Sequence, residues 1–215
     1  MKCLSRQGYV WVLMGVLGVW GYGWSRDAVR EAPSSPQIVA IAPATSRYLQ
    51  DAALGVNEDS VMHHWGFEEG WEGWTTEDLT DPGIMWHRSE QHAYEGNSWW
   101  CSDERIGGYQ NHWLQYLMTP VLDLSGRQNL RLTFKVFWAV EDPGAGDPPP
   151  NPYDGWDGCN VWISVDSGRT WQIIQPVSPR YTHQSLYSFG VEWGMGPNIP
   201  GWCAFSNGWQ DAEFD

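Results

Sequence analysis

The sequence predicts an all-β protein built as an antiparallel β-sandwich, and three observations support this fold class. The 215 residues include 17 tryptophans, and aromatic side chains favour the half-buried surface of a pleated sheet. They also include 24 glycines and 14 prolines, which typically separate strands by tight turns. Short segments alternate apolar and polar residues, and no amphipathic helix is predicted between them.

The clearest strand is Leu130–Trp138, in which every second residue is a large apolar one. This period of two is typical of a strand with one face buried. Cys159–Val165 shows the same alternation. Weaker candidate strands are Val61–Glu68, Ile84–Arg88, Ser98–Cys101, Trp113–Met118, Trp171–Val177, Leu186–Trp193 and Ala212–Phe214.

The N-terminus has the layout of a secretory signal peptide. Lys2 and Arg6 precede an apolar run over Tyr9–Trp20, and small residues follow up to Ser25. The run is shorter than the roughly 20 residues that a membrane-spanning helix needs. We therefore expect residues 1–25 to be removed on export, with an uncleaved anchor as the alternative. No second apolar run follows, so no membrane span is expected in the exported chain.

The rest of the chain divides into a linker and one domain. Residues 26–60 contain scattered prolines, alanines and serines without any sustained period, which predicts a disordered linker. Residues 61–215 are expected to form the β-sandwich. Two long loops, Glu141–Trp156 and Tyr181–Pro200, are candidate ligand-binding segments. The last apolar segment runs up to Asp215, and we expect the domain to be truncated there.

Charge and cysteine content narrow the classes of function. The formal net charge of −14 argues against nucleic acid and anionic membranes as partners. Export would permit disulfides among Cys101, Cys159 and Cys203. Because three is an odd number, one thiol stays free or pairs elsewhere, and the sequence does not select the pair.

One motif is specific. Residues 164–171 read SVDSGRTW, which matches the Asp-box pattern S-x-D-x-G-x-T-W. An aspartate at this position bonds backbone N–H groups across a turn, and a glycine supplies a positive φ. The motif predicts a stabilised hairpin rather than a catalytic site. Its five defining residues are Ser164, Asp166, Gly168, Thr170 and Trp171.

A wider series of segments, in order along the chain, resembles the MAM-like jelly-roll domains of bacterial secreted proteins such as immune inhibitor A. The matching segments are Phe67–Gly70 with Gly73-Trp74, Ala93–Ser98, Leu117–Ser125, Leu130–Glu141, Tyr153–Gly155 with Asp157-Gly158, the Asp-box, and Gly208-Trp209 with Glu213–Asp215. The resemblance implies a jelly-roll sandwich, either MAM/concanavalin-like or galactose-binding-like. The insertion at Pro143–Pro152 and the missing final strands depart from the pattern. No HExxH motif is present, so the family's peptidase chemistry is not expected in this chain.

Relatives of this fold bind a structural calcium ion, which prefers six to eight oxygen ligands. The acidic positions that match the family's motifs are Glu68, Glu141, Asp154 and Asp157. The resemblance therefore implies a Ca²⁺ site at these residues. Solvated loop carboxylates are the alternative.

Three other groups of residues are weaker candidates for a functional site. Adjacent His63 and His64 would face opposite sides of a strand. Glu68-Glu69 and Asp103-Glu104 are candidate acid–base pairs only if two carboxylates face each other across a cleft. Some of the tryptophans could form a sugar-stacking platform, the candidates being Trp99, Trp100, Trp193 and Trp202.

Together these observations predict a non-catalytic binding or adhesion module of a larger secreted or cell-surface protein. Its partner would be an extracellular glycan or a surface protein. The alternative is the ancillary domain of a secreted peptidase whose catalytic domain lies outside this chain. A free-standing glycosidase is a third hypothesis, which only a converging pair of carboxylates would support.

Overall fold

The computed structural model describes residues 9–18, 38–42, 61–80, 86–109, 112–125 and 127–215. Their regular structure consists of strands, with one short π-helical segment, η3 (Ser188–Glu192). The all-β prediction is therefore confirmed. In these ranges no helix has the length and apolar character required to cross a membrane.

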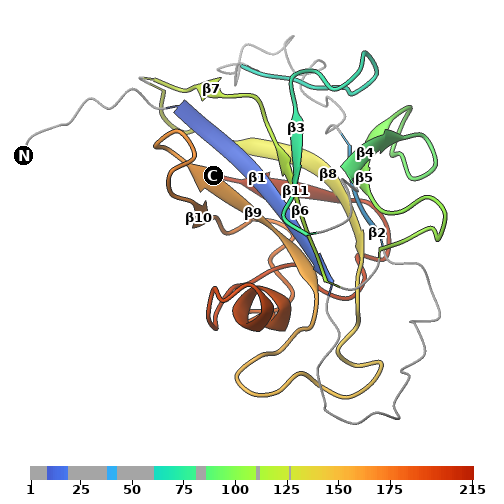
Figure 1. Ribbon diagram of the computed structural model, residues 1–215. Coiled ribbons are helices and arrows are strands. Elements are labelled where there is room, and N and C mark those ends of the chain that lie inside the picture. The colour runs from blue at the N-terminus through green and yellow to red at the C-terminus, as the bar shows by residue number, and fades with distance from the viewer. Residues whose placement is uncertain (1–8, 19–37, 43–60, 81–85, 110–111, 126) are drawn as a thin grey trace, which may run out of the picture.

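The strands form two sheets. The first has six strands in the order β10-β9-β1-β6-β3, with β7 paired to β1 outside this path. Its members are β1 (Tyr9–Gly18), β3 (Thr75–Asp78), β6 (Trp113–Met118), β7 (Leu122–Asp123), β9 (Gly158–Ser164) and β10 (Gln172–Ile173). All their pairings are antiparallel, and Figure 1 shows β1 running between β9 and β6.

The second sheet has five strands in the order β11-β8-β2-β5-β4. Its members are β2 (Ile38–Ala42), β4 (Trp86–Ser89), β5 (Ser98–Cys101), β8 (Leu132–Ala139) and β11 (Gln210–Phe214). These strands also pair antiparallel throughout. The last element of the chain, β11, lies at one edge of this sheet against β8.

The N-terminal part of the chain contributes the middle strand of each sheet. Tyr9–Gly18, within the expected export signal, is the strand β1. Ile38–Ala42, within the expected disordered linker, is the strand β2 between β5 and β8. The linker prediction is therefore wrong for these five residues, because their short β-branched run completes a ladder formed by distant strands. The other residues of the signal and linker, and the start of the Ile84–Arg88 segment, lie outside the described residues.

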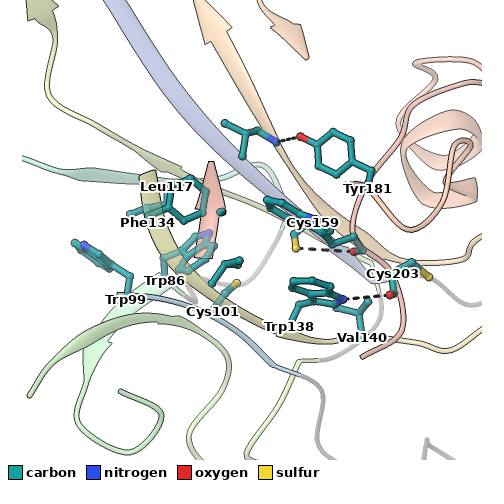
Figure 2. Close-up of a cluster of buried hydrophobic side chains, with 14 of the residues drawn as sticks. Trp86, Trp99, Cys101, Leu117, Phe134, Trp138, Val140, Cys159, Tyr181 and Cys203 are labelled. Carbon is teal, nitrogen blue, oxygen red and sulfur yellow. Dashed lines mark hydrogen bonds between the residues drawn. The ribbon is translucent and has the colours of Figure 1, made fainter. Parts of the chain in front are cut away.

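One hydrophobic core joins side chains of both sheets. The second sheet supplies Trp99, Val136 and Trp138, and the first supplies Leu117 and Val161, all at most 3 % exposed. Figure 2 shows members of this cluster. Burial of this aromatic and aliphatic surface is the main force that holds the chain together, because apolar burial contributes about 25 cal/mol per Å².

Trp202 is a fully buried member of the core that packs against other aromatic rings. Its ring stacks on Trp138 at 5.4 Å and meets Tyr181 edge-on at 5.0 Å. The indole Nε1 donates to the carbonyl of Pro179 at 3.0 Å, while Trp138 Nε1 donates to Cys203 O. Both buried indoles therefore keep a hydrogen bond while their rings fill the core.

Most predicted strands are present, but two are not. Ser98–Cys101 and Trp113–Met118 are strands with the expected bounds. Val61–Glu68 forms no strand, because the chain turns here and Phe67 has a φ of 63°. Leu186–Trp193 contains η3 instead of a strand, because its buried Phe189 packs into the core from a helical turn.

Candidate functional site: the paired long loops

The two long loops of the sequence, Glu141–Trp156 and Tyr181–Pro200, are bonded to each other. The carboxylate of Asp154 accepts hydrogen bonds from the backbone N–H groups of Gln184 and Ser185, at 2.9 and 2.8 Å. The backbone N–H of Tyr187 donates to Gly155 O at 2.8 Å. The loops therefore act as one unit held by bonds between segments about 30 residues apart in sequence.

The segment η3 lies within the second of these loops. Trp193 N–H donates to Ser188 O, a bond that spans five residues. Single turns of this kind are rare and occur frequently at functional sites. Its three buried residues are Ser188, Phe189 and Gly190, whereas Val191 is 47 % exposed. The red coil in Figure 1 marks its place beside the lower end of β9.

Three aromatic rings on the paired loops pack against one another. Tyr153 and Tyr187 meet edge-on at 5.3 Å, and Trp156 meets Tyr187 at 5.0 Å. Trp156 is buried, and its Nε1 donates to Asp147 O. Tyr153 and Tyr187 are half-buried, so each ring is held by packing while part of it contacts solvent.

A histidine–carboxylate pair lies next to Trp193. His112 Nδ1 is 2.8 Å from Glu192 Oε2, and the His112 ring lies 5.1 Å from the half-buried ring of Trp193. Burial raises the pKa of the Glu192 carboxyl above its ordinary value, although the hydrogen bond from His112 opposes this shift. The pair places hydrogen-bonding groups beside the ring of Trp193.

This arrangement is suited to binding. Aromatic rings with a polar tip offer a large contact area with little loss of rotamer freedom, and the hydrogen bonds between the loops fix the backbone that carries them. Residues of this kind on ordered loops are a common basis for recognition. We refer to Tyr153, Tyr187, Trp193, His112 and Glu192 as the loop site.

Two of the four residues considered for calcium are linked by a tyrosine. The Tyr109 hydroxyl donates to Asp157 Oδ2 at 2.8 Å and accepts from the backbone N–H of Glu141 at 3.2 Å. Asp157 is only 1 % exposed. Burial and the neighbouring Asp157 raise the pKa of Tyr109 well above its ordinary value, so the hydroxyl keeps its proton and holds the carboxylate.

The other two residues of that set have different partners. Asp154 bonds the neighbouring loop, as described above. Glu68 accepts hydrogen bonds from the backbone and the side chain of Asn97, both at 2.9 Å, and these bonds lower the pKa of Glu68. Within the described ranges, no three His, Cys, Asp or Glu side chains are grouped to hold a metal ion. Calcium binding stays a prediction.

The Asp-box residues form a compact hydrogen-bonded turn between β9 and β10. Asp166 accepts from Thr170 Oγ1 at 2.6 Å and from Thr170 N–H at 2.9 Å. Ser164 Oγ accepts from Gly168 N–H and donates to Asp166. These bonds, those from Thr170 first, lower the pKa of Asp166 to about 2. Gly168 has a φ of 78°, the left-handed conformation that glycine adopts without strain.

The proposed tryptophan platform is wrong for three of its four members. Trp99, Trp100 and Trp202 are at most 1 % exposed, because they pack between strands rather than on a surface. Only Trp193 is partly exposed. The sequence reasoning did not identify Tyr153, Tyr187, His112 or Glu192, although three of them lie in or beside the two long loops that it selected.

The remaining acidic candidates and His63, together with two further histidines, His87 and His92, have partners of other kinds. Asp103 pairs with Arg105, which lowers the pKa of Asp103. His87 Nε2 lies 3.2 Å from Glu104, and His92 packs on Trp100 at 4.6 Å. His63 stacks on Trp65 at 5.6 Å.

The cysteines carry no cross-link among the described residues. Cys101, Cys159 and Cys203 are all free and buried, and burial raises the pKa of each thiol. They therefore remain neutral and pack as small apolar side chains.

Comparison with known proteins gave no match to any family model, curated protein or solved structure.

Proposed function

We propose that this chain is an exported, non-catalytic binding module that recognises neutral carbohydrate through the loop site. Its two sheets would stack as a β-sandwich of the jelly-roll type, with the paired loops at one end. The observation that carries the proposal is the set of partly exposed rings, Tyr153, Tyr187 and Trp193, held on loops that are bonded to each other.

The chemistry of the loop site favours a sugar ligand. Ring faces can stack on the apolar face of a sugar, while His112 and Glu192 can exchange hydrogen bonds with hydroxyl groups. The net charge of −14 would repel acidic glycans. A neutral oligosaccharide is therefore the expected ligand.

A glycan array that contains neutral and acidic oligosaccharides tests this proposal. We expect saturable binding to neutral glycans, and a loss of affinity on the order of tenfold or more in Tyr187→Ala and in Trp193→Ala. Trp71→Ala is the matched control, because Trp71 is also partly exposed, at 51 %, but packs on Trp99 away from the loop site.

Binding that both loop-site variants retain would contradict the proposal, as would preference for acidic glycans. A chain that binds no glycan but captures a surface protein through these rings would replace carbohydrate by protein as the ligand. Thermal unfolding of each variant shows whether the domain has kept its fold.

A further inference from the structure

Strand β1 has two properties that conflict in an exported protein. Its sequence, YVWVLMGVLG, is uncharged, contains no proline and is the apolar part of the expected export signal. In the structure the same ten residues form a strand within the six-stranded sheet. Removal of residues 1–25 on export would therefore remove a strand with a neighbour on each side.

The pairing of β1 shows how much of the sheet depends on it. Leu13–Gly18 pair with β6, and Trp11–Leu17 pair with β9. Residues 13 to 17 thus have partners on both sides. Among the strands of this sheet, β6 otherwise pairs only with β3, and β9 only with the two residues of β10.

The two strands that flank β1 are among the most buried of the molecule. Leu114 and Leu117 of β6 and Cys159 and Val161 of β9 are at most 1 % exposed with β1 in place. Loss of β1 would open two facing backbone edges beside this core. Unpaired N–H and C=O groups on such edges readily accept another strand.

We propose that leader removal converts the space between β6 and β9 into an acceptor site for a strand from a partner protein. The partner strand would have the chemistry of β1: an extended, uncharged, apolar segment without proline, antiparallel to both neighbours. This inference rests on the export part of the proposed function, and its test measures peptide exchange rather than glycan binding.

The acceptor site would work by completing the sheet. The backbone ladders supply the affinity, because a strand in this position forms hydrogen bonds along both of its edges. Side chains that alternate between the two faces of the strand supply the specificity. A proline in the incoming strand would remove a ladder donor and should not be tolerated.

The test uses the full chain, folded before it is cut. A specific protease site is inserted between Ser25 and Arg26, the purified protein is cleaved, and a fluorescent synthetic peptide of residues 9–18 is added. We expect the cleaved protein to bind one peptide by exchange with its own segment. The uncut protein, in which β1 stays tethered, should bind at least about tenfold less.

Two control peptides distinguish strand addition from non-specific hydrophobic binding. A peptide with Met14→Pro and Leu17→Pro places one missing donor toward each neighbour, since successive residues of a strand direct their N–H groups to opposite sides. A scrambled peptide keeps the composition. Neither should displace the labelled peptide, and equal competition by either would overturn the proposal.

The fate of the leader in the cell provides a second test of the acceptor-site proposal. The N-terminal sequence of the exported protein should begin after residue 18, and an exported chain that retains residues 9–18 would overturn the acceptor site. Failure of peptide exchange would also overturn it. Glycan binding is measured separately, on the array and through Tyr187 and Trp193, so failure of the acceptor site is distinguished from failure of the proposed function.

Discussion

The Asp-box turn and the core around Trp202 are stabilised in different ways. The turn is made by residues within seven positions of each other, and Asp166 and Thr170 bond directly at its surface. Trp202, by contrast, contacts Trp138 and Tyr181 and bonds the carbonyl of Pro179. The turn depends on local sequence, whereas the core depends on segments that are distant in the chain.

The difference should appear in the cost of substitution. A buried ring leaves a cavity that its neighbours fill only partly. An exposed hydrogen bond is replaced by water at little net cost. Changes in the core should therefore lower the free energy of unfolding of the whole domain, whereas changes in the turn should remain local.

The largest effect is expected for Trp202→Ala. Trp202 is fully buried, and truncation of such a ring costs about 3–5 kcal/mol. Denaturant unfolding followed by tryptophan fluorescence measures the loss. Trp71→Ala should cost less than about 1 kcal/mol because its ring is exposed; similar losses for both variants would contradict the burial of Trp202 in the core.

The next effect is expected for Tyr181→Phe. The hydroxyl accepts from the backbone N–H of Val161 and donates to Ile174 O, both at 2.9 Å. Its removal leaves the buried Val161 N–H without that partner, which costs about 1–3 kcal/mol. The hydroxyl of Tyr153 has no hydrogen bond among the described residues, so Tyr153→Phe should change stability by less than about 0.5 kcal/mol in the same assay.

A similar loss of stability, together with a marked loss of binding, is expected for Gly190→Ala. A Cβ at Gly190 would overlap Tyr153 Cε1 and would lie 2.8 Å from Gly196 O. The half-buried Tyr153 ring can move aside, but the Gly196 carbonyl belongs to the backbone and its loop must shift. We therefore expect a cost of about 1–3 kcal/mol and a displaced loop site with weaker glycan binding. Gly146→Ala is the control, because a Cβ there meets nothing within 4 Å.

The smallest effect is a pH dependence confined to the turn. The folded-state pKa of Asp166, about 2, lies below its ordinary value of 3.8. The carboxylate therefore stabilises the turn above pH about 4, and this contribution is lost as the pH falls through 2. NMR titration of the Asp166 side chain should give a midpoint near 2.

Thr170→Val removes the hydroxyl that donates to Asp166 and should raise that midpoint toward the ordinary value. Ser125→Ala, which removes a hydroxyl beside Asp123 instead, should leave it unchanged. A midpoint near 3.8 in the unaltered protein would show that the hydrogen bonds from Thr170 do not hold in solution.

Local patterns in the sequence predicted much of the fold. Leu130–Trp138 and Cys159–Val165 were recognised from their alternation, and both correspond to strands with nearly the expected bounds. The predicted strand at Leu186–Trp193 failed because the same apolar residues suit a buried helical turn. Short apolar runs do not distinguish these two structures.

The loop site was less accessible to sequence reasoning. The loops that carry most of it were selected by their glycine and proline content. Of the rings only Trp193 was a candidate, and neither the two tyrosines nor the His112–Glu192 pair was identified. Asp154 was considered as a calcium ligand, whereas the structure shows it bonding Gln184 and Ser185. These pairings join residues 30 or more positions apart, and no local pattern encodes them.

The sequence by itself determined that the chain forms strands and turns, because alternation, β-branched and aromatic content and the Asp-box act over a few neighbouring residues. Only the tertiary structure decided which strands are neighbours, and in particular that Tyr9–Gly18 and Ile38–Ala42 lie within the two sheets. The physical reason is that a strand gains most of its stability from partners on either side, and those partners are set by the packing of the whole chain.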